Sequence, residues 1–282
     1  MTMPMGSHLA GQDPPVRPAI VGIDHVAFRI SDVPAARRFY RELLGFGVVT
    51  PGAAADALMV RINARQKLLL EPRLAPGNDE RLAHIALATS DLDGMQTWLA
   101  SKNVASTGPE QQPCGKLGLR VRAPDGQVIE FVQETAIVGK VASASSGAIS
   151  SRLLHAGVIV NDEAGAHALF REVLGFGEIW RGGRSEARAD WVNMRVPDGT
   201  DYLEYMLQQT PPDRRQRGVL HHVCLLVPDI QAAWETVRAR SAASERDALQ
   251  RPQIGRNKRW QLNLYDPDGT RVELMEPATT VP

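Results

Sequence analysis

The stretch IDHVAFRI (residues 23–30) decides the fold, because it places a histidine inside an apolar run that the chain repeats three more times. The later copies are LAHIALAT (82–89), LLHAGVIV (153–160) and LHHVCLLV (220–227). Short apolar runs of this kind are typical of buried strands. A polar side chain in such a strand is costly to bury unless something compensates it. The residues that need compensation are His25, His84, His155 and His222.

A glutamate in an apolar run follows each histidine strand. The four runs are KLLLEP (67–72), QVIEFVQ (127–133), DYLEYML (201–207) and RVELMEP (271–277). Neutral imidazole and carboxylate together suit Zn, Fe, Ni, Co or Mn. The pattern therefore predicts a divalent metal of open identity, with one or both of two ligand sets occupied. These sets are His25, Glu71, His84 and Glu130 in the first half, and His155, Glu204, His222 and Glu273 in the second.

The text between these strands repeats as well, so the chain is read as a duplication. FYRELLGFG (39–47) returns as LFREVLGFGE (169–178), and APDGQVIEFVQ (123–133) returns as DPDGTRVELMEP (266–277). Each half splits into two units that read strand, helix and several strands. We expect a first domain over residues 20–133, a linker rich in Ala, Ser and Gly over 134–151, and a second domain over 152–277.

Charge and hydropathy narrow the class of partner. The formal net charge of the 282 residues is zero, which gives no reason to expect nucleic acid or an anionic membrane surface. No apolar run reaches the length that spans a membrane, and the N-terminus lacks the apolar core of a signal peptide. We expect a small-molecule substrate and a cytoplasmic location, with a removed secretion signal left open. The chain is expected to be a monomer or a homodimer.

The strings HVAFRISD, FYRELLGF and PDG followed by IEFVQ resemble the vicinal oxygen chelate superfamily. This group includes glyoxalase I, methylmalonyl-CoA epimerase, type I extradiol dioxygenases and fosfomycin or bleomycin resistance proteins. The resemblance covers nearly all of residues 20–277 apart from the linker. It implies an α+β fold of four βαβββ units that form two cupped mixed β-sheet domains, with metal ligands projecting into the cups. Assembly of a site within one domain or across two domains stays open.

The resemblance first implies a metal-dependent lyase or isomerase like glyoxalase I, in which a Lewis-acid metal stabilises an enediolate. The second half carries the complete two-His two-Glu ligand set of a bacterial-type glyoxalase I. Glu273 is the expected catalytic base on the carbon acid, with Glu204 as the other candidate. Arg29 falls where glyoxalase I keeps an arginine that contacts glutathione.

Two alternatives remain. His155, His222 and Glu273 also resemble the 2-His-1-carboxylate triad of an Fe(II)-dependent extradiol dioxygenase. The catalytic tyrosine of that family falls on Asn263, however, and Glu204 stands where those enzymes keep a further histidine. The other alternative is a non-catalytic ligand-binding or resistance protein. Members of that kind generally lack the full ligand set, which counts against it here.

Further candidates for substrate contact are polar or aromatic residues on strands near the presumed ligands. Trp191 and Asn193 alternate on one strand face, and Asn263 lies on a strand that leads to Glu273. Arginine side chains bind carboxylates by bidentate contacts. The predicted substrate-binding set is Arg29, Trp191, Asn193, Arg259 and Asn263.

Overall fold

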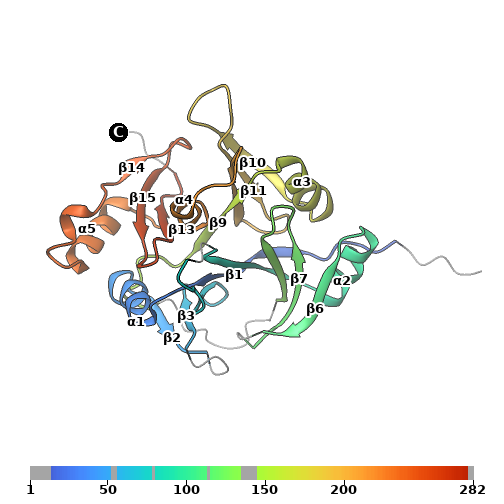
Figure 1. The fold of residues 1–282 in the computed structure, drawn as a ribbon, viewed down its shortest axis with the longest axis horizontal. Coiled ribbons are helices and arrows are strands. Elements are labelled where there is room, and N and C mark those ends of the chain that lie inside the picture. The colour runs from blue at the N-terminus through green and yellow to red at the C-terminus, as the bar shows by residue number, and fades with distance from the viewer. Residues whose placement is uncertain (1–13, 52–55, 78–79, 113–114, 135–144, 279–282) are drawn as a thin grey trace, which may run out of the picture.

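Two mixed β-sheets of eight strands each form the molecule (Figure 1). The computed structural model describes residues 14–51, 56–77, 80–112, 115–134 and 145–278. Most of the expected linker lies outside these residues. The first sheet occupies the lower part of Figure 1 in blue to green, and the second lies above it in yellow to red. The fold class expected from the repeats is confirmed, since each half contains two consecutive βαβββ units.

The first sheet has the strand order β2-β3-β4-β1-β5-β8-β7-β6. Its strands are β1 (Ile20–Arg29), β2 (Gly47–Val49), β3 (Leu58–Arg61), β4 (Lys67–Glu71), β5 (Leu82–Thr89), β6 (Ser106–Gln111), β7 (Leu117–Arg122) and β8 (Val128–Gln133). The two histidine strands, β1 and β5, are antiparallel neighbours at the centre. Each also pairs in parallel with the last strand of its own unit, β4 or β8.

The second sheet repeats this arrangement as β10-β11-β12-β9-β13-β16-β15-β14. Its strands are β9 (Leu153–Val160), β10 (Gly177–Gly182), β11 (Trp191–Arg195), β12 (Tyr202–Leu207), β13 (His222–Leu226), β14 (Gln253–Ile254), β15 (Trp260–Tyr265) and β16 (Arg271–Met275). Strands β9 and β13 are the central antiparallel pair. The histidines and glutamates thus lie on central strands of both sheets.

One helical segment follows the first strand of every unit. The helices are α1 (Val33–Arg37) continued by η1 (Arg38–Leu43), α2 (Leu92–Ser101), α3 (Glu163–His167) continued by η2 (Ala168–Val173), and α5 (Ile230–Arg240). The short helices α4 (Arg214–Leu220) and η3 (Arg246–Ala248) lie in connections. No helix within the described ranges is long and apolar enough to cross a membrane.

Aspartate caps begin the four unit helices, and glycine ends two of them. The side chains of Asp32, Asp91 and Asp162 each accept a backbone N–H of the first turn, as N-cap residues do. Gly45 and Gly175 follow the paired segments with φ of 77° and 81°, a left-handed conformation that glycine adopts at little cost. The sequence repeat therefore encodes both the start and the end of these helices.

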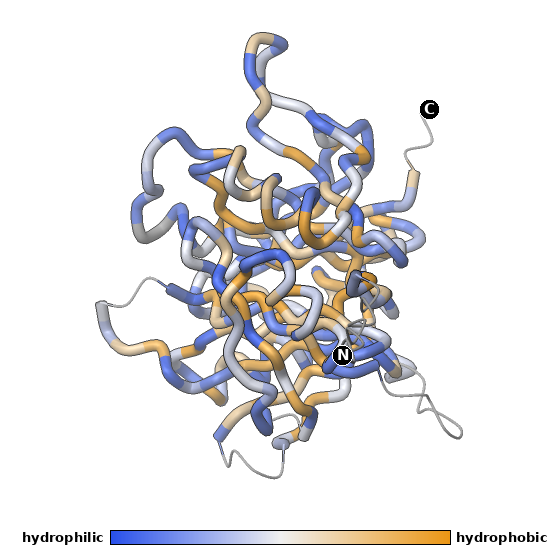
Figure 2. The backbone as a smooth tube through the Cα atoms, turned by 90° about the vertical axis from the view of Figure 1, so that its right-hand side faces the viewer, coloured by the Kyte–Doolittle hydropathy of each residue, from blue (hydrophilic) through white to orange (hydrophobic). Residues whose placement is uncertain are grey.

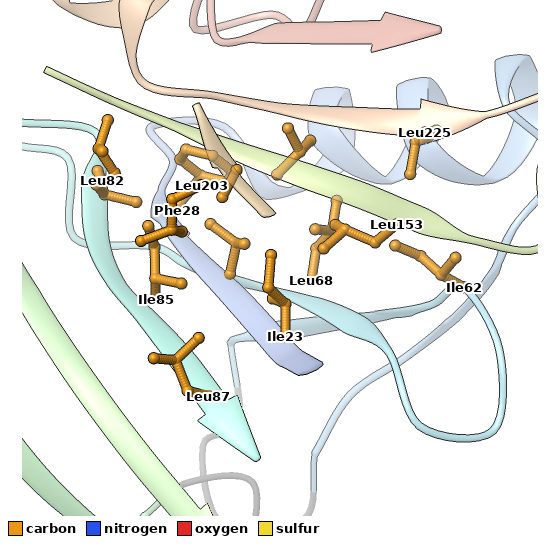
Figure 3. Close-up of a cluster of buried hydrophobic side chains, with 14 of the residues drawn as sticks. Ile23, Phe28, Ile62, Leu68, Leu82, Ile85, Leu87, Leu153, Leu203 and Leu225 are labelled. Atoms are coloured by element: carbon orange, nitrogen blue, oxygen red, sulfur yellow. The ribbon is translucent and has the colours of Figure 1, made fainter. Parts of the chain in front are cut away.

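One continuous apolar core joins the two sheets. Buried residues of the first sheet, such as Ile23 and Phe28, belong to the same cluster as Leu153, Leu203 and Leu225 of the second (Figure 3). Figure 2 shows the same distribution, with hydrophobic segments gathered in the interior and hydrophilic ones at the outer loops. The two sheets consequently stabilise each other by burial of apolar surface.

Polar contacts across the boundary between the two halves fix how the halves are oriented relative to each other. The side-chain amide of Gln66 accepts from the Leu153 N–H at 2.9 Å and donates to the Leu153 carbonyl at 2.8 Å. Asp201 accepts the N–H of Ile23 at 3.0 Å. Tyr40 of η1 donates to the buried Asp266 at 3.2 Å. These groups are paired in the interior, so the two halves have a defined orientation.

Candidate metal centres

The second sheet brings its four predicted ligands onto one face. His155 lies on β9, Glu204 on β12, His222 on β13 and Glu273 on β16, which are adjacent strands. One ligand atom from each residue lies within 4.8 Å of all the others. Gly157 pairs with both Glu204 and His222, so the register fixes which side chains meet. The cluster is assembled within one domain, which answers the question the sequence left open.

The separations between these atoms have the size of a coordination shell. The Nε2 atoms of His155 and His222 are 3.1 Å apart. Oε2 of Glu273 lies 3.5 Å from both, and Oε2 of Glu204 lies 3.7 Å from the first and 3.3 Å from the second. A tetrahedron with such edges has a centre about 2.1 Å from each corner, which is the usual bond length from a divalent metal to nitrogen or oxygen. The donor set therefore fits a metal ion.

The charges of the cluster also call for a cation. Burial alone would raise the pKa of Glu273, but the hydrogen bonds from His155 and His222 outweigh it and lower that pKa. The pKa of Glu204 is lowered in the same way against burial, by His155 and His222. Burial also works against a charged His222, yet the two carboxylates raise its pKa. When both histidines are neutral, the two buried carboxylates leave the cluster with negative charge, which a divalent metal would balance.

The orientation of the His222 ring is fixed by a hydrogen bond from the ring nitrogen that does not face the other ligands. Its Nδ1–H donates to the carbonyl of Leu220 at 2.8 Å, which leaves the lone pair of Nε2 facing the other three ligands. Such a backbone partner sets the tautomer of metal-binding histidines. Gly157 makes room for the ring, since a Cβ at this position would lie 2.0 Å from His222 ring atoms. Gly157 is thus part of the site through its missing side chain.

A cavity of about 600 Å³ opens beside Glu204 and Glu273. Its walls combine aromatic, amide and cationic groups on β10, β11, β15, β16 and the residues around β14. The lining residues are Trp180, Trp191, Gln253, Ile254, Gly255, Arg256, Asn257, Gln261, Asn263 and Arg271. A space of this size accommodates a small organic molecule in contact with the cluster.

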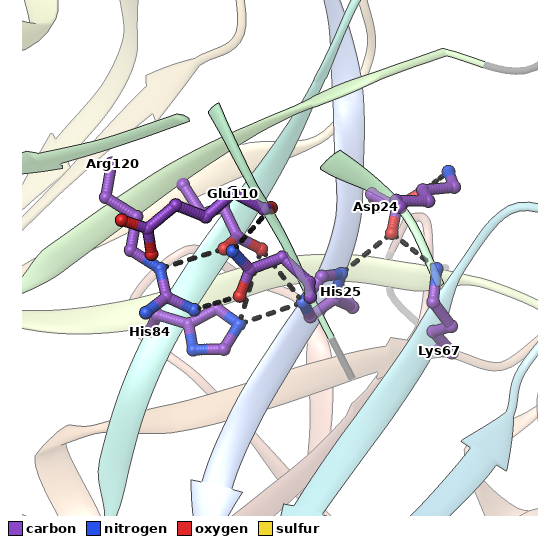
Figure 4. Close-up of polar contacts among 9 residues, drawn as sticks. Asp24, His25, Lys67, His84, Glu110 and Arg120 are labelled. Atoms are coloured by element: carbon purple, nitrogen blue, oxygen red, sulfur yellow. Dashed lines mark hydrogen bonds and ion pairs between the residues drawn. The ribbon is translucent and has the colours of Figure 1, made fainter. Parts of the chain in front are cut away.

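The first sheet gathers three of its four predicted ligands. Nε2 of His25 lies 2.9 Å from Nε2 of His84, and Oε2 of Glu130 is 3.5 Å and 3.6 Å from these two atoms (Figure 4). Burial lowers the pKa of both histidines, which keeps them neutral. The three residues also qualify as a possible metal-binding group.

The structure does not bring Glu71 into this group, so its assignment as a ligand needs correction. In the second sheet His155 pairs with Tyr202 and the ligand Glu204 comes two residues later. In the first sheet His25 pairs with Lys67, so the equivalent position is Leu69. Glu71 lies two residues further along β4, a displacement of about 7 Å. The first sheet therefore lacks a carboxylate at the position of the fourth ligand.

Ion pairs surround the first cluster. Arg120 faces Glu130 across β7 and β8, and its Nε donates to Oε1 of Glu130 at 2.9 Å. Asp24 accepts a hydrogen bond from Nδ1 of His25 at 2.7 Å and pairs with Lys67 and with Lys116 at 2.6 Å. The equivalent of Arg120 in the second sheet is Asn263, which faces Glu273. The carboxylate of the first cluster thus already has a cationic partner.

The predicted substrate-binding residues lie in different parts of the structure. Trp191 and Asn263 line the cavity of the second sheet. Asn193 is buried opposite Glu204, and Oδ1 of both asparagines has no hydrogen-bond partner. Arg29 instead donates to the carbonyls of Glu80 and Leu82 and belongs to neither cluster. Arg259 is not among the cavity-lining residues.

The sequence analysis missed several cavity residues. Trp180, Arg256 and Gln261 come from strands and loops whose positions only the folded sheet reveals. Arg271 could have been found, because it precedes Glu273 by two residues on a strand and such residues share a face.

Comparison with known proteins establishes the family. The profile of the Glyoxalase/Bleomycin resistance protein/Dioxygenase superfamily matches residues 22–131 and 152–274. The chain therefore belongs to this superfamily, which confirms the resemblance seen in the sequence. A search of curated protein sequences finds no significant match.

Solved structures with the same fold include several dioxygenases. The 2,3-dioxygenase LapB from Pseudomonas sp. KL28 is 15% identical with a TM-score of 0.71, and the match covers 94% of each chain. A homoprotocatechuate 2,3-dioxygenase variant from Brevibacterium fuscum is 18% identical with a TM-score of 0.70, over 94% of this chain and 74% of that one. The enzyme from Arthrobacter globiformis is 20% identical with a TM-score of 0.70, over 93% and 82%. At these identities the likeness establishes the fold.

Proposed function

We propose that the chain is a divalent-metal-dependent enzyme whose reaction takes place in the cup of the second sheet, and that the reaction is an Fe(II)-dependent dioxygenation of a small molecule. The observation that carries the proposal is the convergence of His155, His222 and Glu273 beside an open cavity. Two histidines and one carboxylate with open positions are the ligand set of non-haem Fe(II) oxygenases. The likeness to 2,3-dioxygenases over both halves of the chain supports this choice over the lyase.

An iron(II) ion held by these three residues would supply the electron-transfer chemistry by which O₂ reacts with an electron-rich organic molecule. The protein residues would prepare the substrate. Glu204 lines the cavity beside these three residues. Its Oε2 could accept the proton of a substrate hydroxyl that binds in the cavity. Trp180 and Trp191 line the same cavity and offer flat apolar surfaces for a ring.

A second candidate is the lyase or isomerase, and the position of Glu204 favours it. Its Oε2 lies as close to His222 as Oε2 of Glu273 does, at 3.3 Å and 3.5 Å respectively. If both carboxylates bind the metal, the site has the two-His two-Glu set of a Lewis-acid enzyme. Glu273 or Glu204 would then take a proton from a carbon acid. The asparagine at position 263, where a dioxygenase of this family has its tyrosine, points the same way.

The test is elemental analysis of protein purified without oxygen, followed by oxygen-uptake measurements with a panel of catechols. The proposal predicts iron as the main metal, at about one equivalent per chain, and consumption of one O₂ for each molecule of substrate. Nickel, cobalt, zinc or manganese without oxygen uptake would overturn the dioxygenase and favour the second candidate. Protein that takes up no metal under any of these conditions would contradict both.

Glu204→Gln separates the two candidates in the same assay. The dioxygenase keeps three ligands in this variant, so we expect its iron content to stay near that of the wild type. The Lewis-acid enzyme loses one of four ligands and should lose metal affinity by at least about 10-fold. Glu130→Gln is the matched control, because it changes the corresponding kind of residue in the first sheet.

A further inference from the structure

Arg271 has donor groups that the protein itself does not use. It starts β16, pairs in register with His222, and lines the cavity next to Glu273. Its Nε is buried and has no hydrogen-bond partner. Among the described residues it forms no ion pair, although Glu273 lies two positions away on the same strand. A buried guanidinium N–H without an acceptor is costly, so its retention calls for an explanation.

The contact between Arg271 and His222 does not explain the presence of this guanidinium once His222 binds a metal. Nη2 of Arg271 lies 2.8 Å from both ring nitrogens of His222. However, Nδ1 of His222 uses its hydrogen to donate to Leu220. Its Nε2 lone pair points to the other three ligand atoms. A metal-bound His222 therefore has no lone pair to offer, and the guanidinium must find another acceptor in the cavity.

The charge of the cavity points to an anion as this acceptor. A divalent cation would balance Glu204 and Glu273, which leaves Arg256 and Arg271 as unbalanced positive groups in the wall. The position equivalent to Arg271 in the first sheet is Val128, which faces Arg122 as Arg271 faces Tyr265. The fold itself thus has no need of a cation at this point.

We propose that Arg271 binds an acid group of the substrate, so that the substrate class is an anionic molecule with a carboxylate close to its two metal-binding oxygens. This inference rests on the proposed metal site in the second sheet. Nε and Nη2 of one guanidinium form the bidentate fork that matches a carboxylate. Trp180 and Trp191 line the cavity on the side of β10 and β11, where they can cover the ring of such a molecule.

The experiment measures binding by calorimetry under nitrogen, with the protein loaded with Co(II) so that no turnover occurs. The probes are 3,4-dihydroxyphenylacetate and 2,3-dihydroxybenzoate, each compared with its own amide, which has the same shape and no charge. In the wild type at least one acid should bind about 10-fold or more tightly than its amide, a difference of about 1.4 kcal/mol. In Arg271→Met this preference should disappear while the amide binds as before.

Arg195→Met is the matched control, because Arg195 ends β11 of the same sheet but is exposed and outside the cavity lining. Cobalt content and thermal unfolding report whether each variant is folded and loaded. If Arg271→Met does not fold, Arg271→Lys takes its place, and the ammonium group should retain only part of the preference.

Equal affinity for acid and amide in the wild type would overturn the inference, as would a preference that survives in Arg271→Met or no binding of any of the four compounds. The outcome is separate from that of the proposed reaction. Absence of oxygen uptake in the iron-loaded enzyme would refute the dioxygenase, whereas a charge-dependent affinity in the cobalt-loaded protein would still assign the role of Arg271.

Discussion

The cups of the two sheets differ less in their ligands than in what faces those ligands. Both hold two histidines and a glutamate on equivalent strands, with separations of 2.9–3.6 Å between the ligand atoms. In the first cup the glutamate pairs with Arg120, and a leucine takes the place of the fourth ligand. In the second cup the corresponding residues are Asn263 and Glu204, and a cavity opens beside them. If the second cup is the working site, as proposed, the comparison indicates that neighbouring charges decide whether a ligand set is available to a metal.

Removal of a ligand should give the largest difference between the cups. We expect His222→Ala to weaken metal binding and activity by more than about 100-fold. Loss of a residue that only supports a metal ligand already costs about 10- to 100-fold, and this variant removes the proposed ligand itself. The control is His84→Ala, which should change activity by less than about 2-fold. Metal content and steady-state rates check both. A larger loss of activity in His84→Ala than in His222→Ala would reverse the proposed assignment of the working site.

Conversion of the first cup should raise the metal content. The double variant Leu69→Glu with Arg120→Asn installs the two residues that distinguish the second cup. It supplies a fourth ligand, a second carboxylate, and frees Glu130 from its cationic partner. We expect bound metal to rise from about one toward about two equivalents per chain. Arg120→Asn alone serves as the control for charge removal. An unchanged metal content in the double variant would show that the neighbouring charges do not decide between the cups.

A single methyl group should separate the cups as well. In Gly157→Ala the new Cβ would lie 2.0 Å from the His222 ring, so the ring must move. We expect metal affinity to fall by about 10- to 100-fold. The first cup carries Ala27 at the equivalent position, paired with His84, and Ala27→Gly should leave metal binding unchanged. Titration with a competing chelator measures both variants. Wild-type affinity in Gly157→Ala would mean that His222 is not held as tightly as the geometry indicates.

The last effect concerns stability rather than metal binding, and it distinguishes two turns that the duplication made alike. Burial, together with the charge of Asp268, raises the pKa of Asp266 to about 6 against the hydrogen bonds it accepts. A carboxyl group whose pKa is raised by folding favours the protonated form in the folded state. Stability should therefore fall as pH rises from about 4 to about 6, by up to about 3 kcal/mol for a shift of this size.

Asp266→Asn should flatten this pH dependence, because it removes the ionisation that folding opposes. Urea unfolding at several pH values between 4 and 7 measures the free energy of unfolding directly. At the equivalent contact, Ala123 of the first half stands in place of Asp266, and Phe170 of the second half stands in place of Tyr40, so no matching effect is expected there. A wild-type free energy of unfolding that rises over this range would contradict the prediction.

The sequence predicted the fold well because repetition supplied the evidence. Four histidine strands, each followed by a helix and several strands, indicated the repeated units, and the resemblance to the superfamily implied that they are βαβββ units, which the sheets confirm. The four residues that gather in the second cup were predictable for the same reason, since the glutamates recur in similar apolar runs. Strand register was harder to predict. Glu71 was the only glutamate in its run, but the pairing of Lys67 with His25 places Leu69 in the ligand position.

Contacts between residues far apart in the sequence could not be predicted from the patterns of single strands. Nothing in the strand patterns indicated that Arg120 would pair with Glu130 or that Arg29 would donate to the carbonyls of Glu80 and Leu82. These contacts depend on which strand lies next to which, and on loops that approach from other units. Local patterns identify chemistry within a strand, while the partners of that chemistry depend on the topology of the sheet.

The continuous core between the sheets has a consequence for the history of the chain. A duplicated half that lost its chemistry would ordinarily be free to degenerate or to be deleted. Here the first half covers apolar residues of the second, including Leu153 and Leu203. Its deletion would expose them to water and destabilise the half that carries the cavity. If only the second cup is active, selection for it would also preserve the first half as a scaffold, whose polar interior could acquire charges such as Arg120.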